Sequence, residues 1–125
     1  MTLFLSQYEL DLSDLERKIQ MKAELLEPIM SIIMNAGNAK STGFEALNAA
    51  KEGNFEEAEA KIKEAREALV DSHRGQTALL TKEASGEQFD VSLLLIHSQD
   101  HLMNAITFLD LPPALIELYQ PLAAK

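Results

Sequence analysis

The sequence predicts an all-α fold, in the form of an antiparallel three-helix bundle, from three observations. Its 125 residues are rich in Ala, Leu, Glu and Lys, which favour helices, and only five glycines and four prolines interrupt them. Apolar side chains recur at helical spacing in three long stretches, and turn signals separate these stretches. The length is that of one ordinary domain, so we expect a single domain over residues 1–125.

The first helix is predicted over residues 24–52, after a variable N-terminal lead over residues 1–23. Pro28 then falls near the first turn, where its missing N–H costs least. The apolar stripe predicted for this helix comprises Leu26, Ile29 or Met30, Ile33, Gly37, Phe44 and Leu47. Small residues leave a strip along which another helix can approach closely, and these are Ala36, Gly37, Ala39 and Gly43.

The second helix is predicted over residues 55–82. Gly53 ends the first helix, and Asn54 with Glu57 three residues later resembles an N-cap pair. The apolar stripe of the second helix runs to Leu80, and its opposite face carries charged side chains that we assign to solvent. The first two helices therefore form a helical hairpin.

The third helix is predicted over residues 91–111. The segment EASGEQFD before it is the clearest break in the sequence, with a turn at Ser85-Gly86 and with Asp90 as a candidate cap. At the far end, the pair Pro112-Pro113 must break or sharply kink the helix before a C-terminal segment.

This third helix is apolar on both sides, so both sides must be covered. One face gathers Leu93, Leu94, His97, Asp100, His101, Asn104 and Phe108, and the far face gathers Leu95, Leu102, Ile106 and Leu109. The first two helices can cover only one of these faces, and an apolar stripe does not usually stay exposed. Since closed homo-oligomers are the common solution, we expect another copy of the chain to cover the second face.

The composition excludes several classes of function. A formal net charge of −9 makes direct binding to the phosphates of nucleic acid unfavourable, and it favours a partner with a basic docking face. Without cysteine, the chain has neither disulfides nor thiolate metal ligands, and it cannot use thiol catalysis. The start MTLFLSQYELDL lacks the basic region of a secretory signal, and no apolar run is long enough to span a membrane. We therefore expect a cytoplasmic protein that does not insert into the membrane.

The run LLLIHSQDHLMN, residues 93–104, places ionisable side chains in an otherwise apolar helix, where burial without partners is costly. His97 and His101 lie one turn apart on one face, with Asp100 between them. Unmodified imidazole is largely neutral and nucleophilic at cellular pH, so a histidine here could carry a phosphoryl group as a covalent relay.

Two other functions fit the same spacing. The form H-x-x-x-H is used by zinc hydrolases, but two histidines are too few, so a metal-dependent hydrolase needs a third ligand from His73 or Glu117. His73 lies on the apolar stripe of the second helix and is more simply a core or interface histidine. A noncatalytic helical interaction module, in which the histidines only pack at an interface, also fits. Spacing alone leaves these alternatives open.

Several blocks of sequence resemble one known family. The segment HSQDHLMN, with VSLLLI before it and QTALLTKEASGE further upstream, is similar to the phospho-acceptor region of the enzyme IIA subunits of the lactose, cellobiose and diacetylchitobiose type. These subunits belong to the bacterial sugar phosphotransferase system. The blocks IIMNAGNAKSTGFEAL, AKEGNFEEAEAKIKEA, DSHRGQT and LIELY resemble further parts of them. The resemblance covers residues 26–119 and departs from the family pattern at FLDLPPALIELY, where family members generally continue the third helix.

The resemblance implies a homotrimer of three-helix bundles that acts as a phosphotransferase component and catalyses no complete reaction alone. A phosphoryl group would pass from the histidine phosphocarrier protein to Nε2 of His97, the first histidine of the motif, and then to a cysteine of the cognate enzyme IIB. That partner would phosphorylate a β-linked disaccharide of the cellobiose, lactose or chitobiose type during uptake. The membrane subunit, which is not in this chain, mainly selects the sugar.

The resemblance also assigns roles to the neighbours of the acceptor. Asp100 would meet its two symmetry mates on the threefold axis and bind a divalent metal ion, for which magnesium is expected. Three carboxylates that converge on an apolar axis repel one another, which raises their pKa values or demands a cation. His101 and Gln99 are candidates for hydrogen bonds that support the phosphoryl group, although Gln99 points away from His97 on a regular helix.

Overall fold

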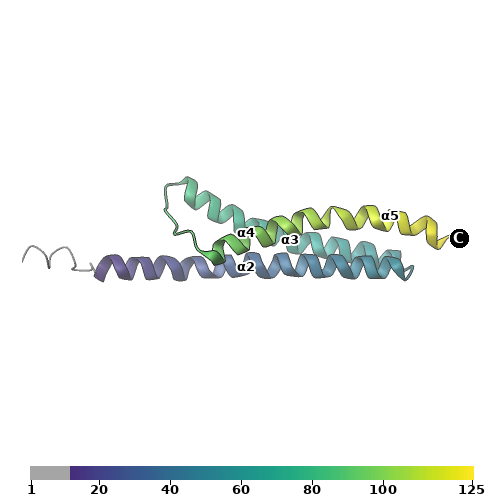
Figure 1. Cartoon of the computed structure of the whole chain (residues 1–125), viewed down its shortest axis with the longest axis horizontal. Helices are drawn as coiled ribbons and strands as arrows, with labels where there is room; N and C mark the ends of the chain where they lie inside the picture. The colour runs from purple at the N-terminus through teal and green to yellow at the C-terminus, as the bar shows by residue number, and fades with distance from the viewer. Residues whose placement is uncertain (1–11) are drawn as a thin grey trace, which may run out of the picture.

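A computed structural model of the chain describes residues 12–125, so residues 1–11 of the expected lead lie outside the described residues. The described chain forms helices and no strand, as predicted. These helices are α2 (Leu12–Lys51), α3 (Phe55–Ala84), α4 (Leu93–Leu109) and α5 (Leu111–Ala123). α2 and α3 form a long antiparallel hairpin, and α4 followed by α5 runs along it in the direction of α2 (Figure 1). Over these residues, no helix combines the length and hydropathy that a membrane span requires.

α2 begins earlier than the sequence predicted. It starts at Leu12, so much of the expected lead is helical, and Pro28 lies inside the helix rather than in its first turn. No glycine or proline occurs before Pro28, and Asp14 in the first turn bonds to Arg17 at 2.6 Å and lies 3.1 Å from Lys18. The hydrogen bond from Arg17, aided by Lys18, holds the pKa of the Asp14 carboxyl below its usual range. Local propensity and charge pairing thus extend α2 beyond the bundle.

The α2–α3 hairpin is held together through small side chains. Buried small residues let the two helices approach closely, and they are Ala36, Ala39, Ala46, Ala49 and Ala50 on α2 and Ala58 and Ala65 on α3. Gly43 is buried as well, but it faces Phe108 and Leu109 of α4. The fully buried hydroxyl of Ser72 donates a hydrogen bond of 2.8 Å to the backbone carbonyl of Ile32. A Cβ at Gly75 would lie only 2.9 Å from Cγ1 of Ile32, so this approach requires glycine. Much of the predicted small-residue strip is therefore the packing surface.

The predicted stripes of large apolar residues match the buried residues only in part, since Ile29 and Ile62 are buried as predicted and others are not. On α2 the core takes Ile29 and Ile32, whereas Phe44 is 54% exposed. On α3 the core takes Leu79, whereas Leu80 is 54% exposed. The predictions for Phe44 and Leu80 were wrong because the contact between these helices favours small side chains, which leaves several large ones on the outer surface.

α4 begins at Leu93, two residues later than predicted, because Ser92 rather than Asp90 caps it. The Ser92 hydroxyl oxygen accepts a hydrogen bond from the Leu95 N–H at 3.1 Å. Asn54, by contrast, precedes α3 without a side-chain cap bond. α3 itself runs two residues beyond the predicted end, to Ala84.

α4 and α5 are separated only by Asp110, so the break falls just before the proline pair. Pro112 lacks the N–H that would bond to the carbonyl of Phe108, and it lies in the first turn of α5, where that N–H is not needed. The chain keeps its general direction through the break (Figure 1). Ile116 of α5 packs into the alanine-rich core of the hairpin, so the C-terminal segment remains part of the bundle.

Candidate functional site

The histidine pair lies in the first half of α4. His97 is exposed, and His101 is half-buried one turn further along. Their imidazole rings stack, with centroids 5.4 Å apart and planes inclined by 29°. The structure therefore brings the two histidines together, with His97 open to solvent and His101 behind it.

α2 holds His101 at a glycine. A Cβ built on Gly37 would lie 3.5 Å from Nε2 of His101, so the imidazole rests close to the α2 backbone. The ring of His101 thus lies next to both Gly37 and the ring of His97. This contact links the predicted small-residue strip of α2 to the histidine motif of α4.

Gln99 faces α3 rather than His97. Its Oε1 accepts a hydrogen bond of 2.7 Å from Nε2 of Gln76, and its own Nε2 donates to the Ser98 hydroxyl at 3.2 Å. That hydroxyl in turn donates 2.6 Å to the carbonyl of Leu95. A bond from Gln99 to a group on His97 would require this chain of bonds to rearrange. Sequence reasoning missed the partnership of Gln76, although a polar residue within an apolar stripe signals a hydrogen bond across the helix interface.

Asp100 lies on the outward surface of α4, within a line of apolar side chains. Leu93, Ile96 and Met103 are 83%, 54% and 52% exposed, and their spacing with Asp100 follows a heptad. Within residues 12–125 the Asp100 carboxylate makes no hydrogen bond or ion pair; only its backbone carbonyl is bonded, by Nδ2 of Asn104 at 3.0 Å. The far face that the sequence predicted is buried at Leu102 and Leu109, so a side of the helix is left uncovered as expected. The uncovered line shares Leu93 and Asp100 with the predicted histidine face, whereas Ile96 and Met103 were on neither predicted face.

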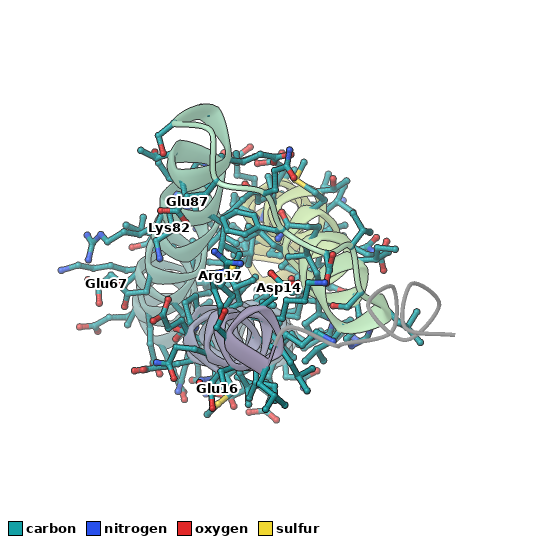
Figure 2. All side chains as sticks on the ribbon, turned by 90° about the vertical axis from the view of Figure 1, so that its left-hand side faces the viewer. Asp14, Glu16, Arg17, Glu67, Lys82 and Glu87 are labelled. Atoms are coloured by element: carbon teal, nitrogen blue, oxygen red, sulfur yellow. The ribbon has the colours of Figure 1, made fainter. Side chains whose placement is uncertain are left out.

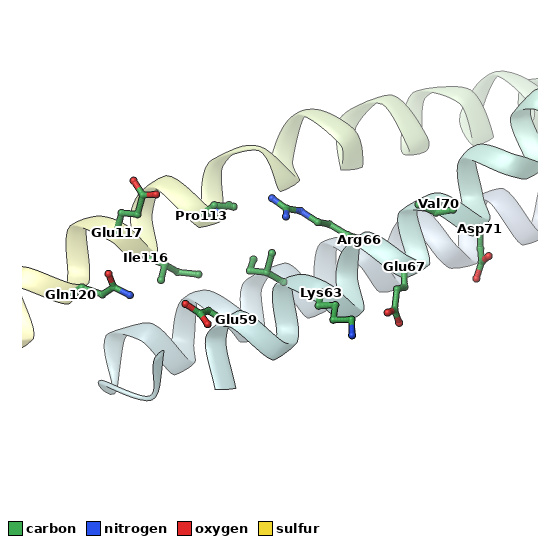
Figure 3. A pocket seen from close by; sticks show the side chains of 11 residues that line it. Glu59, Lys63, Arg66, Glu67, Val70, Asp71, Pro113, Ile116, Glu117 and Gln120 are labelled. Atoms are coloured by element: carbon green, nitrogen blue, oxygen red, sulfur yellow. The ribbon is translucent and has the colours of Figure 1, made fainter. Parts of the chain in front are cut away.

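The third ligand that a metal-dependent hydrolase needs does not assemble in one chain. Among the described residues, no three His, Cys, Asp or Glu side chains gather closely enough to hold a metal ion. His73 was expected to be a core or interface histidine; it is exposed on α3, so it is not in the core, and an interface position stays a prediction. Glu117 lies on α5, where it lines a groove between α3 and α5 (Figure 3). The hydrolase alternative therefore lacks its site.

Two grooves in the described chain lie away from the histidine pair. One, of about 720 Å³, separates α3 from α5, with Arg66 reaching across it and Ile116 forming part of its floor (Figure 3). The other, of about 770 Å³, runs between the start of α2 and the segment before α4. Neither is lined by His97, Asp100 or His101. The candidate site is an open surface, which suits contact with another protein better than capture of a small molecule.

The chain is similar to known proteins over most of its length. The family model of the lactose/cellobiose-specific IIA subunit of the PTS system matches residues 27–120. The lichenan-specific phosphotransferase enzyme IIA component of Bacillus subtilis is 44% identical over 105 residues, which are 84% of this chain and 96% of that protein.

Two solved structures share the fold. The PTS cellobiose-specific enzyme IIA from Bacillus anthracis has a TM-score of 0.77 and 46% identity, and the match covers 81% of this chain and 93% of that one. The IIA(chitobiose)–HPr complex of the N,N'-diacetylchitobiose branch of the Escherichia coli phosphotransferase system gives a TM-score of 0.64 at 37% identity, over 79% and 96%. These likenesses agree with the resemblance drawn from the sequence motifs.

Proposed function

The chain belongs to the lactose/cellobiose-specific IIA family of the bacterial sugar phosphotransferase system, and we propose that it is a phosphocarrier whose acceptor is His97. The observation that carries this proposal is the position of His97, which is exposed on α4 while its ring stacks on that of His101. A phosphoryl acceptor must be reached by a donor protein and then by an acceptor protein, so it belongs on an open surface.

The transfer needs little beyond a neutral imidazole and correct positioning. Nε2 of His97 attacks the phosphorus of the phosphohistidine donor, and the donor's N–P bond breaks with its electron pair returning to the donor ring. The Nδ1 proton of His97 stays in place during the attack. The positive charge that the donor ring loses is therefore gained by the ring of His97. The second transfer runs the same way, with a cysteine thiolate of enzyme IIB as nucleophile.

The position of His97 near the N-terminus of α4 favours a negatively charged group on its imidazole. Helical side chains lean toward the N-terminus, so a phosphoryl group on His97 lies over the first turn of α4, near the positive end of the helix dipole. That turn carries no acidic residue. The helix dipole there stabilises a dianion by an amount on the order of 0.5 kcal/mol. His101 backs the ring, and its contact with Gly37 limits how far the pair can turn.

The donor in this proposal is the histidine phosphocarrier protein, HPr, and the acceptor is the cognate enzyme IIB. A related IIA domain of known structure forms a complex with HPr. The excess of acidic side chains here suits a partner with a basic docking face. The sugar taken up would be a β-linked disaccharide of the cellobiose, lactose or chitobiose type, and the carrier would work in the cytoplasm with its partner proteins.

We propose further that three chains assemble around the outer face of α4, with Asp100 on the threefold axis. The exposed apolar line through Ile96 and Met103 supports this, because such a face needs a cover. One chain offers one unpaired carboxylate there, and three oxygen ligands of this kind suit a hard divalent cation such as magnesium. When bound, the cation would neutralise the mutual repulsion of the carboxylates.

Replacing Asp100 with leucine tests this assembly. The Asp100→Leu variant should remain trimeric after chelation of metal, because it removes the repulsion that the cation offsets, whereas the wild-type trimer should dissociate more readily. Analytical ultracentrifugation with and without chelator measures the difference. Loss of the trimer in the Asp100→Leu variant would overturn the axial assignment.

Mass spectrometry after incubation with phosphoenolpyruvate, enzyme I and HPr tests the carrier function. The chain should gain one acid-labile phosphoryl group, and His97→Ala should gain none. His73→Ala is the matched control, because His73 is exposed on α3 outside the motif, and it should be phosphorylated like the wild type. Absence of a phosphoryl group on the wild-type chain, or its persistence in His97→Ala, would contradict the proposal.

A further inference from the structure

The first four turns of α2 form an extension that the rest of the described chain meets on one side only. Residues 12–26 precede the segment matched by the family model, and they project past the ends of α3 and α4 (Figure 1). Over residues 12–24 no side chain is buried, and only Asp14 and Met21 are half-buried. Since most helical stability in proteins comes from packing, a projecting end of about 22 Å calls for a partner.

Apolar side chains follow one side of this extension. Leu12, Leu15, Ile19 and Leu26 are 70%, 41%, 59% and 50% exposed, and we call these four residues the extension seam. Their spacing of three, four and seven residues is that of the core positions of a coiled coil, with only Lys22 interrupting the repeat.

The outer three residues of the extension seam do not face the chain's own body. The groove between the start of α2 and the segment before α4 is lined by Asp14, Arg17, Lys18 and Met21, and not by Leu12, Leu15 or Ile19. Figure 2 shows Asp14 and Arg17 on the side of α2 toward the other helices, and Glu16 on the opposite side. The body therefore meets the side of α2 that carries Asp14 and Arg17, and Leu26, which also lines this groove, is the seam residue nearest to it.

The charge of the extension does not oppose association between identical chains. Residues 12–26 carry three acidic and three basic side chains, whereas the whole chain has a net charge of −9. Copies of a strongly acidic protein repel one another, but this segment adds nothing to that repulsion. The pairing of Asp14 with Arg17 and Lys18 satisfies part of its charge within one helix.

The extension seam is continuous with the face that holds the candidate site. The same side of α2 continues through Met30, which is 40% exposed, and reaches Gly37, against which His101 rests. The side of α2 that carries the extension seam thus borders the outer face of α4. A neighbouring copy that covers that outer face therefore also lies next to the seam side of α2.

We propose that the extension seam packs against a neighbouring copy of this chain and strengthens the oligomer beyond what the family bundle alone provides. This proposal rests on the homotrimer proposed above. Burial of the seam across a subunit boundary removes large apolar side chains from water in every subunit at once. The extension is then an added subunit contact rather than a variable lead.

The test replaces the seam while keeping helix propensity. The full-length variant Leu12→Gln/Leu15→Gln/Ile19→Gln removes the apolar contact with residues that still favour a helix. Its trimer should dissociate at a protein concentration at least tenfold higher than the wild type in sedimentation equilibrium. The control Arg17→Gln/Glu24→Gln changes exposed side chains of the same segment without changing net charge, and its trimer should match the wild type.

The outcomes separate this inference from the proposed function. A wild-type chain that is monomeric overturns both, whereas a seam variant that associates as tightly as the wild type overturns only the seam contact. If residues 1–11 of the same chain cover the seam instead, the variant lowers the melting temperature equally at all protein concentrations and leaves association unchanged. That result also overturns the proposal.

Discussion

The inner and outer faces of α4 are built from different kinds of side chain. The inner face is buried against the rest of the bundle and consists of Ser98, Leu102, Ala105 and Leu109. Among the described residues, no buried side-chain nitrogen or oxygen lacks a hydrogen-bond partner. The outer face leaves large apolar groups exposed and carries His97 and Asp100. One helix thus separates the residues that stabilise a single chain from the residues that meet other molecules.

The two faces should differ most in how unfolding responds when adjacent residues of α4 are replaced by alanine. Leu102 is fully buried and Met103 is 52% exposed. Leu102→Ala should lower the free energy of unfolding by about 2–5 kcal/mol, because it leaves a cavity between α2, α3 and α4. Met103→Ala should act on association and change the dependence of the unfolding midpoint on protein concentration.

Urea unfolding followed by circular dichroism, over a range of protein concentrations, measures both effects. Equal losses that are independent of concentration would show that the outer face contributes to the single chain as much as the inner face does. The comparison between the two faces would then fail.

A smaller effect should follow the loss of the hydrogen bond between Gln76 of α3 and Gln99 of α4. Gln76→Leu leaves the amide oxygen of Gln99 without its partner, so the free energy of unfolding should fall by about 1–2 kcal/mol. Thr77→Ala is a suitable control, because the exposed Thr77 hydroxyl bonds only to a carbonyl of its own helix and the loss should stay below about 0.5 kcal/mol.

A double-mutant cycle sharpens this prediction. Gln76→Leu/Gln99→Leu removes both partners, so it should cost less than the sum of the two single changes. Strictly additive losses in urea unfolding would mean that the bond between these side chains does not couple α3 to α4.

The helices and the histidine motif were predictable because their signals are local. Helix propensity, the glycines between helices and the spacing of His97 and His101 can all be read from neighbouring residues. The prediction that the third helix has a second apolar face without a cover in its own chain also follows from the sequence, and the exposed Leu93 agrees with it.

The rotation of α2 about its own axis, which decides which of its sides faces the core, was not predictable in the same way. Its sequence carries two apolar stripes, and the choice of Ile32 over Phe44 for the core depends on how closely α3 approaches. That approach is set by Ser72 and Gly75, about 40 residues away in the chain, where a hydroxyl and a missing Cβ meet Ile32. The pairing of Gln76 with Gln99 depends on the same packing.

The smallest expected effect concerns Gly37, where the small-residue strip of α2 meets the outer face of α4. An alanine Cβ would lie 3.5 Å from Nε2 of His101, an ordinary contact, so Gly37→Ala should keep the rate of His97 phosphorylation within about twofold. Gly37→Val adds two methyl groups beyond that point and should displace His101. A misplaced ring beside the nucleophile should slow the transfer about tenfold.

Initial rates of phosphorylation by HPr, together with NMR of the His101 imidazole, distinguish a positioning role from general damage. Asn38→Val is the matched control, because Asn38 is exposed on the same turn of α2 and receives the same β-branched side chain there. If Gly37→Val moves the His101 resonances while phosphorylation continues at the wild-type rate, the stack on His101 does not orient His97. If both change together and Asn38→Val changes neither, α2 positions the ring behind the acceptor through a contact at Gly37 that has no room for a side chain larger than a methyl group.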